Sequence, residues 1–262
     1  MDLGLKGKYA LVMASSGGLG LGIAHALAAE GAHVMLTGRT ADTLARAAGE
    51  IEKKHGVPTR WHAADLADPA TPQGLVDAGV DAFGRIDILV NNTGGPPPGP
   101  LAAVEPATVA AQFQAMVLSI LAVTRAVLPG MQEAGWGRII TVGSSGIVQP
   151  IPNLGISNAL RGALAGWSKT LAAELAADGI TVNMLLPGRI HTDRVDQIDA
   201  ATAKRTDASL AEVIAASHKT IPAGRYGTVA EFAAVAAFLA SGPASYVTGS
   251  MIRCDGGMIR SV

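Results

Sequence analysis

The chain carries the run Ala14-Ser15-Ser16-Gly17-Gly18-Leu19-Gly20-Leu21-Gly22 directly after an apolar segment, residues 9–13, and directly before a helical pattern. Glycines in such a strand-turn-helix run let the backbone approach a pyrophosphate and let the helix pack against the strand. The free N–H groups and the positive dipole at the start of the helix favour phosphate there. The run therefore predicts a dinucleotide-binding unit, with a packing-only glycine turn as the alternative interpretation.

Short apolar or β-branched runs alternate with longer helical patterns along the rest of the chain. This repeated β-α-β order predicts an α/β fold of the Rossmann type, a doubly wound parallel sheet flanked by helices. No linker or repeat interrupts the pattern, so we expect a single domain covering residues 1–262. The predicted strands are 9–13, 33–37, 59–62, 86–90, 138–142, 180–185 and 250–253, and the predicted helices are 20–30, 41–55, 70–83, 108–134, 154–177 and 229–240.

Two irregular segments follow predicted strands. Residues 93–100 form a Gly/Pro-rich loop, and residues 188–222 lack a clear apolar pattern. Ligands bind at the carboxyl ends of the strands in open α/β sheets, so both segments are expected near the ligand. The second is long enough to form a substrate lid, within about 188–222.

Composition excludes several classes of function. The formal net charge of −1 provides no basic surface for nucleic acid. The N-terminus does not resemble a signal peptide, and we find no apolar run of the ~20 residues that span a bilayer. We therefore expect a cytoplasmic protein with no membrane contact. The single Cys254 excludes an internal disulfide, and the six histidines lack metal-ligand spacing, so no metal site is expected.

Cofactor choice is predicted from the end of the second strand, which reads Leu36-Thr37-Gly38-Arg39-Thr40. An acidic residue here would bind a ribose 2′-hydroxyl, and none is present. Arg39 instead offers a planar, permanent cation that suits a 2′-phosphate. The sequence favours NADP(H) over NAD(H), the alternative being that Arg39 is a solvated loop cation.

Further motifs carry a family resemblance that extends from about Lys6 to Met258. The segment from Ser157 to Glu174 reads SNALRGALAGWSKTLAAE and resembles the active-site helix of short-chain dehydrogenases/reductases. The branch it most resembles is the 3-oxoacyl-[acyl-carrier-protein] reductases. The other matching motifs are Asn91-Asn92-Thr93-Gly94, Asn183 to Asp193, Pro222 to Gly227, Tyr246-Val247-Thr248-Gly249 and Asp255-Gly256-Gly257.

The resemblance implies a set of cofactor contacts. Asp65 matches the family's acidic residue that contacts the adenine amine, with a helix N-cap as the alternative role. Thr192 matches the threonine that binds the nicotinamide carboxamide. Ala14 adds a methyl group where the family has a turn glycine. The expected cofactor-binding residues are Ser15, Ser16, Gly18, Leu19, Gly20, Arg39, Asp65, Asn91, Gly94, Arg161, Pro187, Gly188, Ile190 and Thr192.

The same resemblance implies a departure at the reaction centre. Ser157 and Arg161 stand where the family has its catalytic Tyr and Lys, and Met116 stands where it has the Asn of a proton-relay water. Ser144 matches the active-site Ser that hydrogen-bonds the substrate oxygen. An alcohol is a far weaker acid than a phenol, Arg keeps its proton, and a thioether cannot replace an amide in a hydrogen-bond relay.

A proton donor must then be sought among other groups. His191 titrates near neutrality in its unperturbed state, with an exposed loop imidazole as the alternative interpretation. The expected catalytic residues are Ser144, Ser157, Arg161 and His191.

Two hypotheses of function remain open. The first is an NADP(H)-dependent oxidoreductase that acts on a small-molecule carbonyl or hydroxyl substrate. The second is an NADP-binding protein without redox turnover, either a non-redox enzyme or a regulatory subunit. The resemblance also implies a homotetramer, because residues 108–134, 154–177 and 246–262 correspond to the family's two subunit interfaces.

Overall fold

The fold is a seven-stranded, wholly parallel sheet, described for residues 1–262 by a computed structural model. The strand order is β3-β2-β1-β4-β5-β6-β7, so the chain winds outward in both directions from the β1/β4 pair. This order confirms the predicted doubly wound fold and places the ligand-binding crevice at the carboxyl ends of those central strands. The strands are β1 (Tyr9–Val12), β2 (His33–Gly38), β3 (Thr59–Ala63), β4 (Ile88–Asn91), β5 (Gly137–Val142), β6 (Ile180–Pro187) and β7 (Met251–Cys254).

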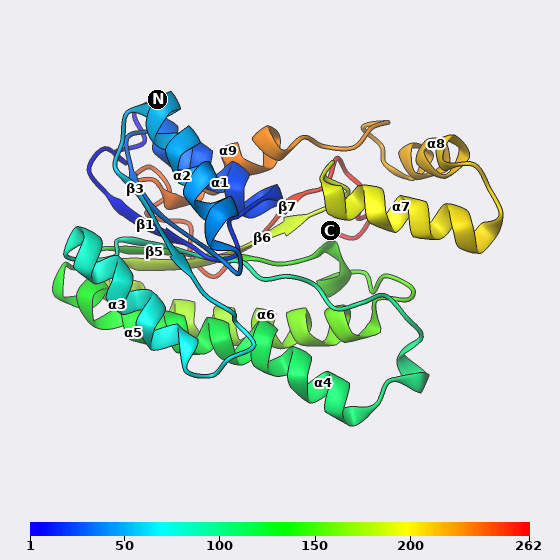
Figure 1. The fold of residues 1–262 in the computed structure, drawn as a ribbon, viewed down its shortest axis with the longest axis horizontal. Coiled ribbons are helices and arrows are strands. Elements are labelled where there is room, and N and C mark those ends of the chain that lie inside the picture. The colour runs from blue at the N-terminus through cyan, green and yellow to red at the C-terminus, as the bar shows by residue number, and fades with distance from the viewer.

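Helices cover both faces of the sheet (Figure 1). One face carries α1 (Gly18–Ala29), α2 (Ala41–His55) and α9 (Val229–Ala240), and the other carries α3 (Thr71–Phe83), α5 (Ser119–Glu133) and α6 (Gly155–Leu175). Small residues permit close packing, since a Cβ on Gly22 of α1 would lie 2.0 Å from Cγ1 of Val229 on α9. The buried strands are apolar in consecutive positions because both faces of the sheet are covered.

Every predicted strand and helix is present, with ends within two residues of the expected ones. The helix predicted for residues 108–134 is divided into α4 (Pro106–Phe113), a π-helical turn η2 (Gln114–Leu118) and α5. Single π-turns inside α-helices occur frequently at functional sites. The turn contacts α6, the helix that carries Ser157 and Arg161, so its position bears on the reaction centre.

The prediction that residues 188–222 are irregular is wrong. This segment contains two helices, α7 (Asp193–Thr206) and α8 (Leu210–Thr220). Acidic residues in the first turn of α7 and basic residues in its last turn complement the helix dipole. A capping box between Ser209 and Glu212 starts α8. The short 3₁₀ turns are η1 (Leu101–Ala103), η3 (Ser145–Ile147) and η4 (Ala176–Asp178).

The continuous helical stretch Pro106–Glu133 is long and apolar enough to cross a bilayer by length and composition alone. Core helices of soluble proteins pass the same test, so this stretch does not overturn the expectation that the chain has no membrane contact. Its inner side packs in the core through Val123, Val127 and Met131. Only 33% of the most apolar 18-residue part of this stretch is buried within the chain, so much of its outer side is apolar and exposed.

Candidate active site

The glycine loop leaves open space and free donors at the start of α1. Its N-cap Gly17 supplies no side-chain cap, and the first turn holds no acidic residue. The N–H groups of Gly18, Leu19 and Gly20 have no acceptor in the chain. A Cβ on Gly17 would meet nothing within 4 Å, and a Cβ on Gly18 would meet only Thr192 Cγ2 at 4.0 Å. This arrangement fits a pyrophosphate held by backbone donors.

Glycine is required at position 20 because the neighbouring atoms leave no room for a Cβ. A Cβ on Gly20 would lie 2.5 Å from the carbonyl oxygen of Ala14 and 2.9 Å from Nδ2 of Asn92. Asn92 donates a hydrogen bond to that same carbonyl oxygen at 3.1 Å. The glycine loop and the end of β4 are therefore tied together at the central crevice.

Ala14 has a left-handed backbone conformation, with φ of 46°. Its N–H group donates to Oγ1 of Thr37 at 3.2 Å, which holds the turn against β2. This conformation is unfavourable for an L residue with a Cβ and favours glycine. The loop therefore adopts the conformation of a glycine turn despite the methyl group.

The structure contradicts the assignment of Ser15 as a cofactor contact. Ser15 is fully buried, and its hydroxyl donates to the Val12 carbonyl oxygen at 2.7 Å and accepts from the Thr37 N–H group at 2.9 Å. Its own N–H group donates to the Thr37 carbonyl oxygen at 2.7 Å. No donor of Ser15 is left for a ligand, because its hydroxyl donates to β1 and its N–H group donates to β2.

The side chains of Asn91 and Ile190 are also turned into the protein. Asn91 is buried, and its amide donates to Oγ1 of Thr124 on α5 at 3.0 Å. Ile190 is buried and pairs with Gly227 through a β-bridge. These two predicted residues offer no side-chain contact to a cofactor, although their backbone lies at the carboxyl edge of the sheet.

Two polar residues expected on the adenosine side are exposed. Arg39 forms no hydrogen bond or ion pair with the chain, and its neighbour Gly38 abuts Ser16 of the glycine loop. Asp65 accepts a hydrogen bond from the N–H group of Ala67 at 3.0 Å. Asp65 does not cap α3, so the helix-capping alternative is wrong.

The remaining predicted contacts lie along the edge beyond β4 and β6. Gly94 is exposed, and a Cβ there would meet nothing within 4 Å. Pro187 ends β6, and Gly188 packs so closely on the C-terminal segment that a Cβ would lie 2.6 Å from Cα of Asp255. Thr192 follows and forms the N-cap of α7, where its methyl group faces Gly18.

Two serines with available hydroxyl groups stand at the reaction centre. Ser144 follows β5, and its Oγ accepts a hydrogen bond from the N–H group of Gly146 at 3.0 Å, which leaves its own proton free to donate. Ser157 lies in the first turn of α6, is half-buried and has no partner in the chain. Both hydroxyls are therefore available to a bound molecule.

Arg161 links α6 to the end of β5. It lies one turn after Ser157, so the two residues share a helix face. Its Nη1 donates to the Val142 carbonyl oxygen at 2.7 Å, two residues before Ser144. Burial lowers the pKa of Arg161 from its ordinary value to about 10. A positive charge therefore stands beside the two serines.

Met116 lies inside the π-turn η2 and is buried in the core cluster shared with α6. Its thioether has no N–H or O–H group to donate, so no relay passes through this position. The positions at which the resemblance implies a replacement, Met116, Ser157 and Arg161, thus lie on two elements that contact each other, η2 and α6.

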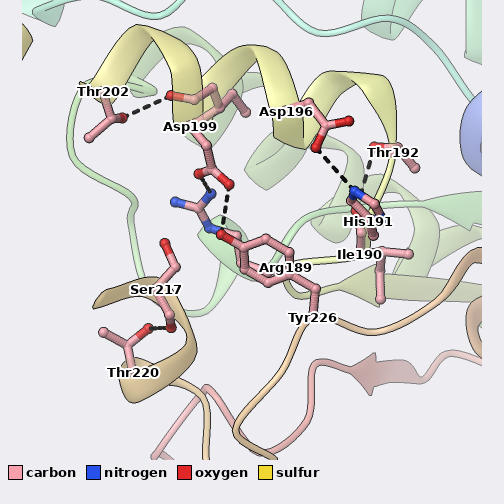
Figure 2. A network of polar contacts seen from close by, with 11 residues as sticks. Arg189, Ile190, His191, Thr192, Asp196, Asp199, Thr202, Ser217, Thr220 and Tyr226 are labelled. Carbon is pink, nitrogen blue, oxygen red and sulfur yellow. Dashed lines mark hydrogen bonds and ion pairs between the residues drawn. The ribbon is translucent and has the colours of Figure 1, made fainter. Parts of the chain in front are cut away.

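His191 stands apart from these residues. Its ring is 66% exposed and lies 3.1 Å from a carboxylate oxygen of Asp196 on α7 (Figure 2). No hydrogen bond joins it to Ser144 or Ser157. The structure favours the exposed loop imidazole over a proton donor.

A polar network that the sequence did not predict anchors α7 over this edge. Buried Asp199 accepts hydrogen bonds from Arg189 at 2.6 Å and from the Tyr226 hydroxyl at 2.7 Å (Figure 2). Burial raises the pKa of Tyr226, so its hydroxyl keeps the proton that it donates. Arg194 of α7 donates to the Pro96 carbonyl oxygen at 3.0 Å, which joins the helix to the Gly/Pro loop after β4.

Comparisons with known proteins agree with the doubly wound fold. A family model described as Enoyl-(Acyl carrier protein) reductase matches residues 13–259. The 2,3-dihydroxy-2,3-dihydro-p-cumate dehydrogenase of Pseudomonas putida is 33% identical over 97% of this chain and 95% of its own length. The 3-oxoacyl-[acyl-carrier-protein] reductase of Salmonella typhimurium is 35% identical over 98% and 99%. The structure of L-sorbose reductase from Gluconobacter frateurii, complexed with NADPH and L-sorbose, is 33% identical with a TM-score of 0.95 and covers 100% of both chains.

Proposed function

Because the chain belongs to the short-chain dehydrogenase/reductase family, we propose that it is an NADP(H)-dependent oxidoreductase that interconverts a carbonyl and a hydroxyl group on a small molecule. The main support is geometric. The open start of α1, Ser144 and Arg161 lie at the carboxyl edge of one sheet, and the methyl group of Thr192 faces Gly18 at the same edge. The NADPH bound to L-sorbose reductase supports the choice of cofactor.

The residues present fit the proposed cofactor. The N–H groups of Gly18 to Gly20 would hold its pyrophosphate, Arg39 would hold the 2′-phosphate, and Thr192 would hold the carboxamide. Arg161 would take the place of the family's Lys at the ribose with only part of its five N–H donors. When bound, the nicotinamide supplies or accepts the hydride.

Ser144 and Ser157 bind the substrate oxygen and supply its proton, and the charge of Arg161 assists them. Ser144 donates its free proton as a hydrogen bond to that oxygen. Ser157 gives up a proton and recovers it from water, because the neighbouring charge of Arg161 stabilises its alkoxide. An alcohol is a poor acid even so. General acid catalysis is worth about 10²–10⁴-fold, so we expect slow turnover that depends mostly on positioning.

Calorimetry with NADPH, followed by a panel of carbonyl substrates monitored by cofactor absorbance, tests the proposal. We expect NADPH binding and slow oxidation of NADPH with at least one ketone. The variant Ser144→Ala should keep NADPH affinity and lose most of the turnover. Absence of NADPH binding would remove the basis of the proposed function.

Restoring the family residues gives a second test. We expect the double variant Ser157→Tyr/Arg161→Lys to reduce simple ketones at least tenfold faster than the wild type, because a phenol beside an ammonium group is the better acid. The measurement is the rate of NADPH oxidation at saturating cofactor. A slower double variant, acting on a ketone that the wild type reduces, would show that Ser157 and Arg161 form a different, functional acid system.

The second candidate is an NADP-binding protein without redox turnover. The observation that favours it is the joint replacement of Tyr, Lys and Asn by Ser157, Arg161 and Met116. Tight NADPH binding with no oxidation across the panel would support this candidate against the first.

A further inference from the structure

Two arginines are buried in this chain, and their surroundings differ sharply. Arg138 is 2% exposed and donates to three carbonyl oxygens, those of Gly137, Gly179 and Ser241, at 2.8, 3.2 and 3.1 Å. Its guanidinium also lies 4.3 Å from the ring centre of Trp136. Every face of this structural arginine is therefore occupied by the protein.

Arg161 is 8% exposed and has a single partner, the Val142 carbonyl oxygen. A guanidinium carries five N–H donors, so most of those on Arg161 are unused. The small exposed fraction of Arg161 means that its free nitrogens are not completely closed off by the protein. The unused donors of Arg161 thus point to a molecule that is not part of the chain.

The charge of Arg161 is also unbalanced. No Asp or Glu forms an ion pair with it, and burial alone lowers its pKa. The side chains beside it at the ends of β5 and α6, Ser144, Ser157 and Asn158, are neutral. An uncompensated buried charge is unfavourable, and an anion that enters the site relieves it.

We propose that Arg161 binds a carboxylate of the substrate, so that the natural substrate is an oxo acid or a hydroxy acid. This inference rests on the proposed function, since the carboxylate shares the site of hydride transfer. One guanidinium with no second cation beside it matches the single charge and the planar, two-oxygen shape of a carboxylate. A phosphate monoester, with nearly two charges, is matched less well.

Calorimetry with matched acids and esters tests the proposal without any turnover. The probes are acetoacetate, methyl acetoacetate, pyruvate, methyl pyruvate and inorganic phosphate, each titrated into the apoprotein and into the protein saturated with NADP⁺. Losing a charge-assisted hydrogen bond typically costs about 1.5–3 kcal/mol, which is about 10–150-fold in affinity. We expect at least one acid to bind at least tenfold more tightly than its ester.

Variants assign that preference to the guanidinium. Arg161→Met should abolish the preference for acid over ester, and Arg161→Lys should keep part of it. Arg46→Met, which removes an exposed cation from α2, should leave it unchanged. Thermal unfolding and an NADPH titration of each variant separate misfolding and cofactor loss from loss of the anion site.

The proposal is overturned if no acid binds, if the esters bind as tightly as the acids, or if Arg161→Met retains the preference. Tighter binding of phosphate than of any carboxylate also overturns it. Acid binding without NADPH binding would leave a carboxylate site at Arg161 and sink the proposed function. NADPH binding and turnover of neutral ketones, with no preference for acids, would do the reverse.

Discussion

Ala14 adopts a left-handed backbone conformation, with φ of 46°, that is unfavourable for alanine and favours glycine. A left-handed conformation costs an L residue about 1–2 kcal/mol, whereas the extra freedom of glycine in the unfolded chain costs about 0.4–1 kcal/mol. We therefore expect Ala14→Gly to raise the free energy of unfolding by about 0.5–1 kcal/mol, measured by urea denaturation. As a control, Ala45→Gly on the exposed side of α2 should lower it by about 1 kcal/mol. Equal destabilisation by both substitutions would contradict the strain at Ala14.

Arg39 is the residue on which cofactor selectivity is expected to depend. It is exposed and unpaired next to the glycine loop, so its charge is available to a 2′-phosphate. A charge-assisted contact contributes about 1.5–3 kcal/mol, so Arg39→Ala should weaken NADPH binding at least tenfold and leave NADH nearly unchanged. Calorimetry with both cofactors measures the ratio, with Arg46→Ala as a matched control. Equal losses for the two cofactors, or a native preference for NADH, would sink the assignment.

Sequence motifs identified the positions of the site better than the roles of individual side chains. Ser15 and Ser16 are adjacent residues of the same type, yet the hydroxyl of Ser15 is fully engaged in hydrogen bonds to β1 and β2. Asn91 and Asn92 differ in the same way, since one binds Thr124 in the core and the other ties the glycine loop to β4. The direction in which a side chain points at the end of a strand depends on its contacts with elements distant in the sequence. A local sequence pattern carries no information about those contacts.

Elements that face the core were predicted almost completely, because their apolar periodicity reflects burial. The elements over the site were predicted poorly. Helix α7 is mostly polar, α8 has only 11 residues, and their start signals, Asp193 and the Ser209–Glu212 capping box, are charged and short. The π-turn around Met116 has no sequence signature of its own. The Arg189–Asp199–Tyr226 network joins residues up to 37 positions apart, so only the fold brings it together.

Contact between α1 and α2 is expected to make the fold sensitive to acid. Nδ1 of His25 lies 3.1 Å from Nε2 of His55, and burial, the partner ring and Lys54 lower the pKa of His25, while burial and Lys54 lower that of His55. A pKa below 6.5 in the folded state means that stability from this pair is present above pH 6.5 and is lost as the pH falls through the folded values.

Thermal unfolding between pH 8 and pH 5 measures this effect. The wild type should lose stability towards pH 5, and His55→Asn should lose less because it removes one of the two coupled rings. His62→Asn, which alters a histidine of β3 outside the pair, serves as the control. An identical pH dependence in all three proteins would contradict the role of the pair.

At the scale of the whole molecule, the single chain leaves two apolar surfaces uncovered. The first lies on the outer side of α4 and η2, where Phe113 and Leu118 are exposed. The second lies near the C-terminus, where Tyr246 is fully exposed and Met251 of the edge strand β7 is half-exposed. Clusters of exposed apolar side chains are typical of subunit interfaces. The two surfaces coincide with the segments that the family resemblance assigned to two different interfaces.

We therefore expect a homotetramer in which each surface forms one of two independent two-fold contacts. Leu118→Glu should disrupt the first contact and leave a dimer held by the second, and Met251→Glu should do the opposite. The combined variant should be a monomer, because a buried unpaired carboxylate is unfavourable at both contacts. Sedimentation velocity at micromolar concentration distinguishes the three states, with Ala45→Gly as a control that alters neither surface. A monomeric wild type, or a tetramer that survives both substitutions, would show that these apolar surfaces serve another purpose.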